Sequence, residues 1–318
     1  HWHNEKIVCN PRVDIDLQYL PVPRRRIFNN KKYEQFGAIV GLETKRGCSQ
    51  KCIYCADPVA KGTRMRLRPP EMVVKELQDL LEQGVSWLHL CDSEFNLPIK
   101  HAKEICQAII DKGLGDKIRW YCYCAPTPFD SELARLMKGA GCAGINFGVD
   151  SLCDDQLHRL GRLHSSNDVH QLVRLLHNEG LNYMFDLLIG SPEETEDTVR
   201  ITIDKAREFN IPLVGIAVGV RLYPNTVLGN AVTDGIIKAG LHPDINKDLD
   251  QPVFYLSPSL NNASTLINQL VGNDPRFLML SAPAEKGSYN YAGDEVLSNL
   301  IKQGARGAYW DIIRQHRN

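Results

Sequence analysis

Short runs of β-branched and aromatic residues alternate with longer stretches of helical period from about residue 38 onward. These apolar runs predict six strands, at 38–44, 87–93, 118–124, 144–151, 183–190 and 214–222. Between them, stripes of apolar residues with helix start and stop signals predict five helices, at 71–83, 101–112, 131–138, 169–178 and 193–208. Strands that alternate with helices are typical of repeated β/α units, in which the strands run parallel.

Parallel strands linked by helices form either a doubly wound sheet or a closed or partial barrel, because both faces of the sheet must be covered. The periodicity alone does not distinguish these α/β folds. The pattern breaks before residue 38 and after about residue 240. We therefore predict an N-terminal linker at 1–37, a domain of repeated β/α units at 38–240 and a C-terminal α/β extension at 241–318. The extension contains an apolar run at 252–256 and a last helix near 294–302.

Composition narrows the classes of function. Hydrophobic residues make up 43% of the chain and charged residues 24%, which is typical of a globular protein with a large core. The formal net charge of −1 offers no general attraction to nucleic acid or to an anionic membrane. No apolar segment is long enough to cross a bilayer, and no signal peptide opens the chain, so the sequence predicts a cytoplasmic protein with a small-molecule substrate.

Three cysteines within eight residues form the strongest chemical signal. All ten cysteines lie in the first half of the chain, and Cys48, Cys52 and Cys55 are spaced CxxxCxxC on the loop after the first strand. Three thiolates can each bind one iron of a cubane cluster and leave the fourth iron open. A structural zinc site or an electron-transfer ferredoxin needs a fourth protein ligand, and no second pair of ligands at zinc-finger spacing occurs here. Three cysteines that are merely buried are the unreactive alternative.

This motif resembles the signature of the radical S-adenosylmethionine (SAM) superfamily, in which an aromatic residue, here Tyr54, precedes the third cysteine. The resemblance extends over residues 38–225 and implies a partial (β/α)6 TIM-like barrel. It also implies that Cys48, Cys52 and Cys55 hold a [4Fe–4S] cluster that cleaves SAM reductively and forms a 5′-deoxyadenosyl radical. A flavodoxin or ferredoxin would supply the electron. A barrel interior that excludes solvent would then protect the radical.

The resemblance further implies which residues bind SAM, and ligands of β/α folds gather at the carboxyl ends of strands. Each part of SAM has its implied residues. Tyr54 lies beside the cysteines, and the others are Asp92, Ser93 and Glu94 for the amino group, Asp150 and Ser151 for the ribose, Arg162 for the carboxylate, and Gly190 and Val220 for the adenine. Two positions depart from the family pattern, because Asp150 replaces a glutamate and Glu193 replaces a glycine. A helix-capping loop at 91–96 and a surface ion pair of Arg162 are the structural alternatives.

Four further residues are candidates for the substrate side. Arg221 and Tyr223 follow the last strand of the pattern. Cys122 and Cys124 share one face of the third strand, and a thiol could donate a hydrogen atom to a product radical if that face is the barrel interior. Simple burial of both thiols is the alternative.

The segment 13–24, with Asp16, Pro21 and Pro23, resembles the connector between the cobalamin domain and the barrel of cobalamin-dependent radical SAM enzymes. The few residues before it have no room for such a domain, so we expect either that the domain was cut away or that it was lost. The first case favours methylation of a carbon with cobalamin, and the second favours chemistry with SAM alone. A different cleavage that transfers a 3-amino-3-carboxypropyl group, and a non-catalytic iron–sulfur protein for electron transfer or sensing, also stay open.

Overall fold

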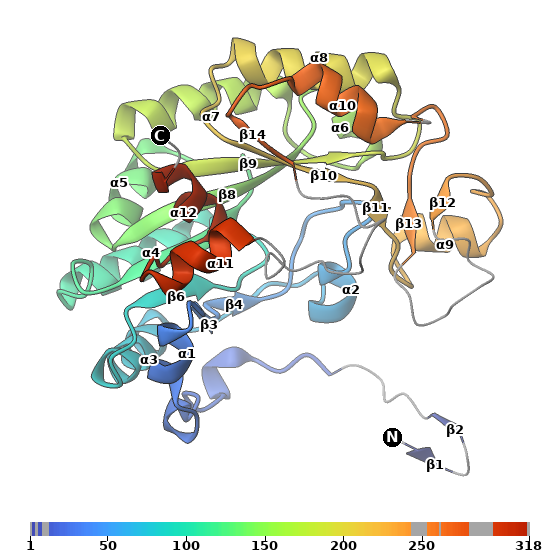
Figure 1. The fold of residues 1–318 in the computed structure, drawn as a ribbon. Helices are drawn as coiled ribbons and strands as arrows, with labels where there is room; N and C mark the ends of the chain where they lie inside the picture. Colours follow the sequence, from blue (N-terminus) through green and yellow to red (C-terminus); the bar gives the residue numbers. More distant parts are fainter. Residues whose placement is uncertain are drawn as a thin grey trace.

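A computed structural model describes residues 2–3, 6–7, 13–242, 253–260, 262–279 and 295–316. All six predicted strands are confirmed and form one parallel sheet (Figure 1). They are β3 (Val40–Leu42), β6 (Trp87–Leu90), β7 (Arg119–Cys124), β8 (Cys142–Asp150), β9 (Tyr183–Ile189) and β10 (Val214–Val218). A seventh strand, β14 (Phe277–Met279), comes from the segment predicted as a C-terminal extension and pairs with β10. The order is β14-β10-β9-β8-β7-β6-β3, so β3 and β14 are the two edges among the described residues.

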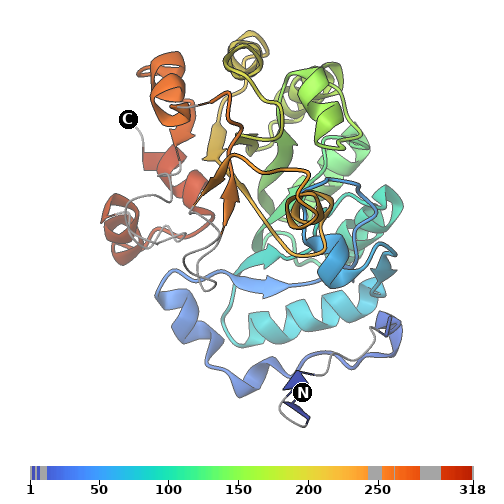
Figure 2. The same cartoon turned by 90° about the vertical axis from the view of Figure 1, so that its right-hand side faces the viewer.

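The predicted helices are confirmed and cover one face of this sheet. They are α3 (Pro70–Glu82), α4 (Ile99–Asp111), α5 (Ser131–Gly139), α7 (Ser166–Glu179) and α8 (Glu196–Glu208), joined by α10 (Ala263–Val271) of the C-terminal segment. Figure 2 shows that these helices follow one another around the strands in the order of the sequence. This curved arrangement agrees with the partial barrel that the sequence predicts.

Helix α8 begins three residues later than the predicted start at residue 193. Glu193 has a φ of 59°, in the left-handed region, and therefore cannot be part of the helix. Thr195 is the N-cap, because its side chain accepts a hydrogen bond from the backbone of Thr198.

Alternation along each strand separates a helix-covered face from an interior face. On β7, the fully buried Trp120, Cys122 and Cys124 belong to the main core between the sheet and the helices. Tyr121 lies in a different cluster on the opposite face, with Trp310 of the C-terminal segment. The interior face, and not the helix-covered one, is therefore free to carry ligand chemistry.

Two C-terminal helices are present among the described residues, and the second of them packs against this interior face. The predicted helix near 294–302 is confirmed as α11 (Glu295–Lys302), and a further helix, α12 (Tyr309–His316), was not predicted. Trp310 of α12 is fully buried against Tyr121, with their ring centroids 6.0 Å apart. The hydroxyl of Tyr121 donates to Asp311 at 2.7 Å.

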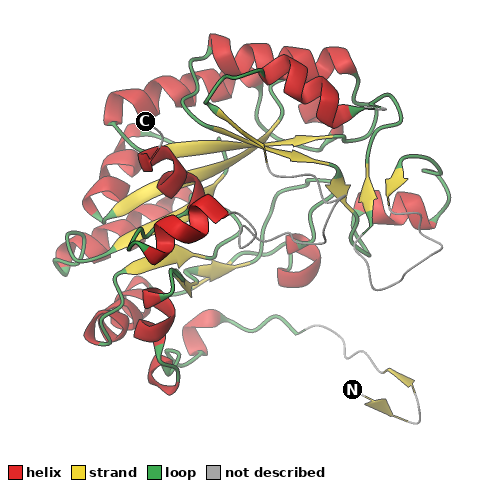
Figure 3. Ribbon diagram, in the orientation of Figure 1, coloured by secondary structure: helices red, strands yellow, loops and turns green. Residues whose placement is uncertain are grey.

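The last predicted strand, 214–222, is interrupted at Gly219, where φ is 86°. The chain beyond it forms β11 (Val220–Arg221), which pairs antiparallel with β13 (Phe254–Tyr255), part of the predicted apolar run at 252–256. The remaining elements are short (Figure 3): β1 (Trp2–His3), β2 (Lys6–Ile7), β4 (Lys45–Arg46), β5 (Arg66–Leu67), β12 (Leu241–His242), α1 (Asn30–Gln35), α2 (Asp57–Lys61), α6 (Asp154–Arg159), α9 (Val227–Thr233) and the 3₁₀ turns η1 (Leu17–Tyr19) and η2 (Arg25–Ile27).

The N-terminal linker covers the edge of the sheet at β3. Arg25 donates to the carbonyl oxygen of Gly41 at 2.8 Å and pairs with the buried carboxylate of Glu76 at 2.6 Å. Covering an edge strand in this way removes a site for unwanted strand pairing. In the part of the chain that the structure describes, no helix is both long and apolar enough to cross a membrane.

Candidate active site

The three clustered cysteines lie on the loop between β4 and α2, where the carboxyl ends of the parallel strands converge. Cys48 is buried, Cys52 and Cys55 are half-buried, and all three are free thiols. The loop starts at Gly47, which has a φ of 102°, and a Cβ there would overlap the carbonyl oxygen of Arg64. Only glycine fits this close approach, which explains why glycine stands directly before the first cysteine.

The segment before Arg162 docks directly on this loop. Ile53 donates its backbone N–H to the carbonyl oxygen of Leu160 at 3.1 Å. Gly161 has a φ of 72°, and a Cβ there would contact the backbone of Lys51. Arg162 therefore reaches the cysteines, and its Nη1 donates to Sγ of Cys52 at 2.9 Å.

Arg162 is also the centre of a buried polar network. Its Nε lies 3.3 Å from Oδ2 of Asp150, and both side chains are less than a tenth exposed. Its Nη2 donates to the carbonyl oxygen of Gly148. The same Oδ2 of Asp150 accepts a hydrogen bond of 2.6 Å from the hydroxyl of Tyr54, whereas Oδ1 accepts none from the described residues. The structure thus brings Tyr54 together with Asp150 and Arg162, although Tyr54 precedes Asp150 by 96 residues in the chain.

Glu94 adds a buried carboxylate to this network. A Cβ on Gly148 would lie 3.3 Å from Nη2 of Arg162 and 3.8 Å from Oε1 of Glu94, so both side chains meet above this glycine. Oε2 of Glu94 is buried and has no hydrogen-bond partner. Burial, and next the charge of Asp150, raise the pKa of Glu94 to about 7, although Arg162 opposes this shift. A buried carboxylate oxygen without a partner is costly, which is a reason to expect a ligand there.

The thiols themselves fit a cluster better than a single metal ion. Among the described residues, no three His, Cys, Asp or Glu side chains are placed to hold one metal ion. The thiolates of a cubane bind different irons, so they need not converge on one point. Burial raises the pKa of all three thiols, that of Cys55 to about 11. They would therefore remain protonated at neutral pH until a metal displaces the proton.

Asp92, predicted to bind the amino group of SAM, is fully engaged within the protein. Its Oδ1 accepts from the backbone N–H groups of Thr44 and Lys45 at 2.8 and 3.1 Å, and its Oδ2 accepts from the hydroxyl of Thr44. The ammonium of Lys45 lies 3.1 Å from Oδ2, and both side chains are almost completely buried. Asp92 therefore joins the segment just before the cysteine loop to the end of β6.

Replacing Asp92 by asparagine is expected to lower the free energy of unfolding by about 1.5–3 kcal/mol, because the buried ammonium of Lys45 loses its charged partner. Glu94→Gln is the matched comparison two residues away, and we expect it to cost less than Asp92→Asn because Oε2 of Glu94 has no hydrogen-bond partner to lose. Urea denaturation of both variants measures the difference. Equal losses of stability would contradict the structural role of Asp92.

Ser93 and Ser151 also bond within the protein. The Ser93 hydroxyl donates to Asp57 at the start of α2. Ser151 is completely buried, and its hydroxyl is 2.9 Å from that of Thr202 on α8. In the two predicted polar motifs, Glu94 and Asp150 therefore each keep a carboxylate oxygen without a hydrogen-bond partner among the described residues. The neighbouring residues Asp92, Ser93 and Ser151 hold the loops in place instead.

The turn after β9 is held by Glu194. Its Oε2 accepts from the backbone N–H groups of Gly190 and Ser191 at 2.5 and 3.0 Å. Gly190 has a φ of 107° and approaches Gly219 so closely that a Cβ would lie 3.3 Å from its backbone nitrogen. Glu193 adopts the left-handed conformation at the position where the family pattern has glycine.

The last predicted site residues lie on β11 and just after it. Val220 is buried with Leu228 and Tyr255, and Tyr54 of the cysteine loop packs against this cluster. Arg221 is exposed, and its guanidinium lies 4.9 Å from the ring centroid of Tyr223. The structure thus joins Val220 to the cysteine loop and leaves Arg221 at the surface.

Cys122 and Cys124 were predicted to donate a hydrogen atom only if their face of the strand is the barrel interior, and it is not. Their sulfurs are 3.8 Å apart, and both side chains are completely buried in the core between the sheet and the helices. The interior face of β7 carries Tyr121 instead. These thiols pack as core residues, because the odd and even positions of β7 face opposite sides.

Sequence reasoning missed three residues that shape the site. Lys45 and Asp57 flank the cysteine motif and anchor Asp92 and Ser93, and Glu194 holds the turn at Gly190. A charged residue directly before or after a ligand loop is a usable signal for the first two. Glu194 stands beside a second glutamate, and nothing in the sequence distinguishes the buried one.

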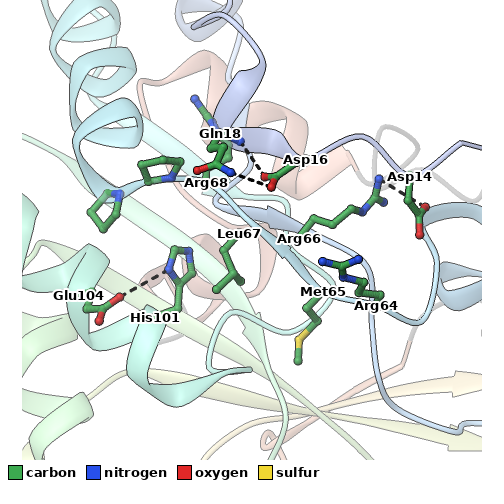
Figure 4. A pocket seen from close by; sticks show the side chains of 12 residues that line it. Asp14, Asp16, Gln18, Arg64, Met65, Arg66, Leu67, Arg68, His101 and Glu104 are labelled. Carbon is green, nitrogen blue, oxygen red and sulfur yellow. Dashed lines mark hydrogen bonds and ion pairs between the residues drawn. The ribbon is translucent and has the colours of Figure 1, made fainter.

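Two cavities lie apart from this network. One, of about 410 Å³, lies between the linker and the barrel, where Asp14 faces Arg66 and Glu104 faces His101 (Figure 4). The other, of about 390 Å³, lies along the edge at β3 and reaches Cys91. Mixed charges line both, and Arg66 lies 3.6 Å from Asp14, so these contacts hold the linker on the barrel.

Comparisons with known proteins agree with this geometry. The sequence profile of the radical SAM superfamily matches residues 42–206. A tryptophan 2-C-methyltransferase of Streptomyces laurentii is 30% identical over 89% of this chain. An uncharacterized methyltransferase of Pyrococcus horikoshii is 29% identical over 67% of the chain. The chain spans only 57% and 46% of these two relatives.

Solved structures show the same likeness. The radical SAM methyltransferase TsrM from Kitasatospora setae, with tryptophan and a SAM analogue bound, has a TM-score of 0.78 and 29% identity and covers 90% of this chain. The chain covers 63% of that structure. The cobalamin-dependent radical enzyme OxsB, at 17% identity and a TM-score of 0.63, shares the fold over 79% of this chain and 43% of its own.

Proposed function

The chain belongs to the radical SAM superfamily, and from this premise we propose that it is a methyltransferase that acts on a carbon of a small, aromatic, amine-bearing substrate such as tryptophan. Its cofactors are a [4Fe–4S] cluster and SAM. We assign this chemistry to residues 38–240, with residues 1–37 as an entry linker and 241–318 as an extension.

One observation carries the proposal. Groups that suit a cluster and an amino acid converge at the carboxyl ends of the strands, although they come from loops far apart in the chain. Arg162 joins Cys52 to Asp150, and Glu94 lies beside Arg162 above Gly148. An electron carrier needs thiols but no such arrangement of a guanidinium and open carboxylate oxygens.

Each group has a role that its open atoms permit. Cys48, Cys52 and Cys55 would hold the cluster, which supplies the electron for cleavage of SAM when it is bound. Arg162 suits the SAM carboxylate by its charge, because a guanidinium carries five N–H groups and those donated to Cys52 and Gly148 leave further donors. The unpartnered Oε2 of Glu94 suits the ammonium, and Oδ1 of Asp150 suits a ribose hydroxyl. Tyr54 orients Asp150 by its hydrogen bond.

The reaction and the substrate class follow from the relatives. The Streptomyces laurentii protein is named for methylation of carbon 2 of tryptophan, and the Kitasatospora setae enzyme was solved with tryptophan bound. Cobalamin is present in a second structure of that enzyme. We assign no described residue to cobalamin, and no step of the proposal depends on it. A flavodoxin or ferredoxin is the proposed reductant.

The test is an anaerobic assay of the reconstituted chain with dithionite, SAM and L-tryptophan, with and without added hydroxocobalamin. Mass spectrometry of the products should show methylated tryptophan together with a SAM-derived nucleoside. The chain without iron is the control and should give neither. Methylthioadenosine would indicate transfer of the 3-amino-3-carboxypropyl group instead. A fully loaded cluster that yields no SAM product would overturn the enzymatic function and favour an electron carrier or sensor.

A further inference from the structure

A single carboxyl group on the interior face of the sheet has no role in the site described above. Tyr183, Phe185, Leu187 and Ile189 of β9 belong to the helix-side core, so Asp186 between them faces the interior. Its side chain is surrounded by protein yet partly accessible. A lone acid on an otherwise apolar strand calls for a partner.

Two residues orient this carboxyl group. Nδ2 of Asn146 donates to Oδ2 of Asp186 at 3.0 Å. Oδ1 of Asn146 in turn accepts a hydrogen bond of 2.6 Å from the indole nitrogen of Trp310, which is fully buried. Because the indole can only donate, the Asn146 amide must present its NH2 group to Asp186. The C-terminal helix α12 thereby sets the direction of a carboxyl group on β9.

The second oxygen of Asp186 is open. Oδ1 accepts no hydrogen bond from the described residues. It points toward Gly215 of β10, where a Cβ would lie 3.0 Å away. A larger residue at position 215 would crowd this oxygen. The bare backbone at Gly215 leaves this side of the carboxyl group to Oδ1 itself and to the thioether of Met184, whose Cε and Sδ would lie 3.1 and 3.3 Å from such a Cβ.

Asp186 is the immediate neighbour of the proposed SAM site. In the register of the sheet, Asp186 is paired with Gly148, the residue above which Arg162 and Glu94 meet. Adjacent strands lie about 4.8 Å apart. The Asp186 residue is therefore about one strand spacing from the glycine above which Arg162 and Glu94 meet.

We propose that Asp186 anchors the substrate by accepting a hydrogen bond from its amino group through Oδ1, with Asn146 and Trp310 as positioning residues. This inference rests on the proposed function, and it extends that function by assigning the residue that recognises the amine. Other groups on the same face suit an aromatic substrate, because the rings of His89 and Tyr123 lie 5.6 Å apart there and Met184 adds a thioether.

The charge of Asp186 depends on pH in the physiological range. Burial raises its pKa to about 7, Asn146 lowers it by donating a hydrogen bond, and Asp150 raises it by its charge. In the register of the sheet, Gly215 of β10 is the residue paired with Asp186, and α12 acts through Asn146. An ammonium ligand pairs with the ionised form, so its affinity should rise as the pH increases through about 7.

The experiment is calorimetric titration of the cluster-loaded chain with L-tryptophan and with indole-3-propionate, which lacks the amine. We expect Asp186→Asn to weaken tryptophan binding at least tenfold at pH 8 and to leave indole-3-propionate binding unchanged. Asp116→Asn makes the same chemical change at an exposed turn and should alter neither. SAM affinity, measured in parallel, should be the same in all three proteins.

A second variant tests the positioning role. Asn146→Ala removes the donor that lowers the pKa of Asp186, so the pH midpoint of tryptophan binding should move upward. A purely structural role would lower the affinity at every pH and leave the midpoint in place.

These titrations distinguish a wrong role for Asp186 from a wrong substrate class. If the wild-type chain binds tryptophan and Asp186→Asn binds it equally well, the role of Asp186 is overturned and the proposed function stands. A loss of SAM affinity in Asp186→Asn would also overturn it, because Asp186 would then belong to the SAM site. If the wild-type chain binds neither indole compound, the proposed substrate class falls, and the inference falls with it.

Discussion

Alanine at Cys48, Cys52 or Cys55 is expected to reduce the iron of the reconstituted chain from about four atoms to fewer than about one, because in the proposed site each thiolate would bind a separate corner of the cubane. SAM cleavage should fall to background in all three variants. Iron analysis, the visible absorbance of the cluster and product analysis under dithionite measure these changes.

Cys142→Ala is the matched control for this prediction. Cys142 is also a free, half-buried thiol, but it lies at the start of β8, away from the cysteine loop. This variant should keep its iron and its SAM cleavage. If Cys142→Ala lost as much iron as the others, the cluster would not be held by the cysteine loop alone.

Replacement of Arg162 by glutamine is expected to have the second largest effect, on both stability and SAM binding. The guanidinium is nearly buried and contacts Cys52, Gly148 and Asp150. Its removal leaves buried carboxylates without a cation, which should cost about 3–5 kcal/mol of the free energy of unfolding. SAM affinity should fall as well, because the proposed partner of its carboxylate is gone.

Two comparisons separate these effects. Arg159→Gln removes an exposed partner of Glu193, at 3.1 Å, and should cost no more than about 1 kcal/mol. Arg162→Lys keeps the charge but not the planar fork, so it should recover much of the stability and little of the SAM affinity. Chemical denaturation and equilibrium dialysis with labelled SAM give the two readouts. Full SAM affinity in Arg162→Gln would show that this arginine only stabilises the fold.

The sequence by itself predicts most of the regular elements. Six parallel strands and five helices follow from the period of apolar residues, because each period depends only on neighbours along the chain. The spacing of Cys48, Cys52 and Cys55 is equally local, and it led to the correct family. The strand β14 escaped this reading, because it lies beyond residue 240, where the alternation of strand and helix patterns breaks off.

Only the tertiary structure decides which polar groups are open to a ligand. Asp92 and Glu94 are two residues apart and look equivalent in the sequence. Asp92, however, bonds to Thr44 and Lys45 with both oxygens, whereas one oxygen of Glu94 has no hydrogen-bond partner. Cys122 and Cys124 share a face as predicted, but the packing of the helices makes it the outer one.

Asp186 shows the same division. Its position on a strand is evident from the sequence, but its orientation depends on Asn146 and on Trp310, which is more than a hundred residues away. Whether a buried polar atom has a partner is a property of contacts between distant segments, and the local pattern of the chain does not contain it.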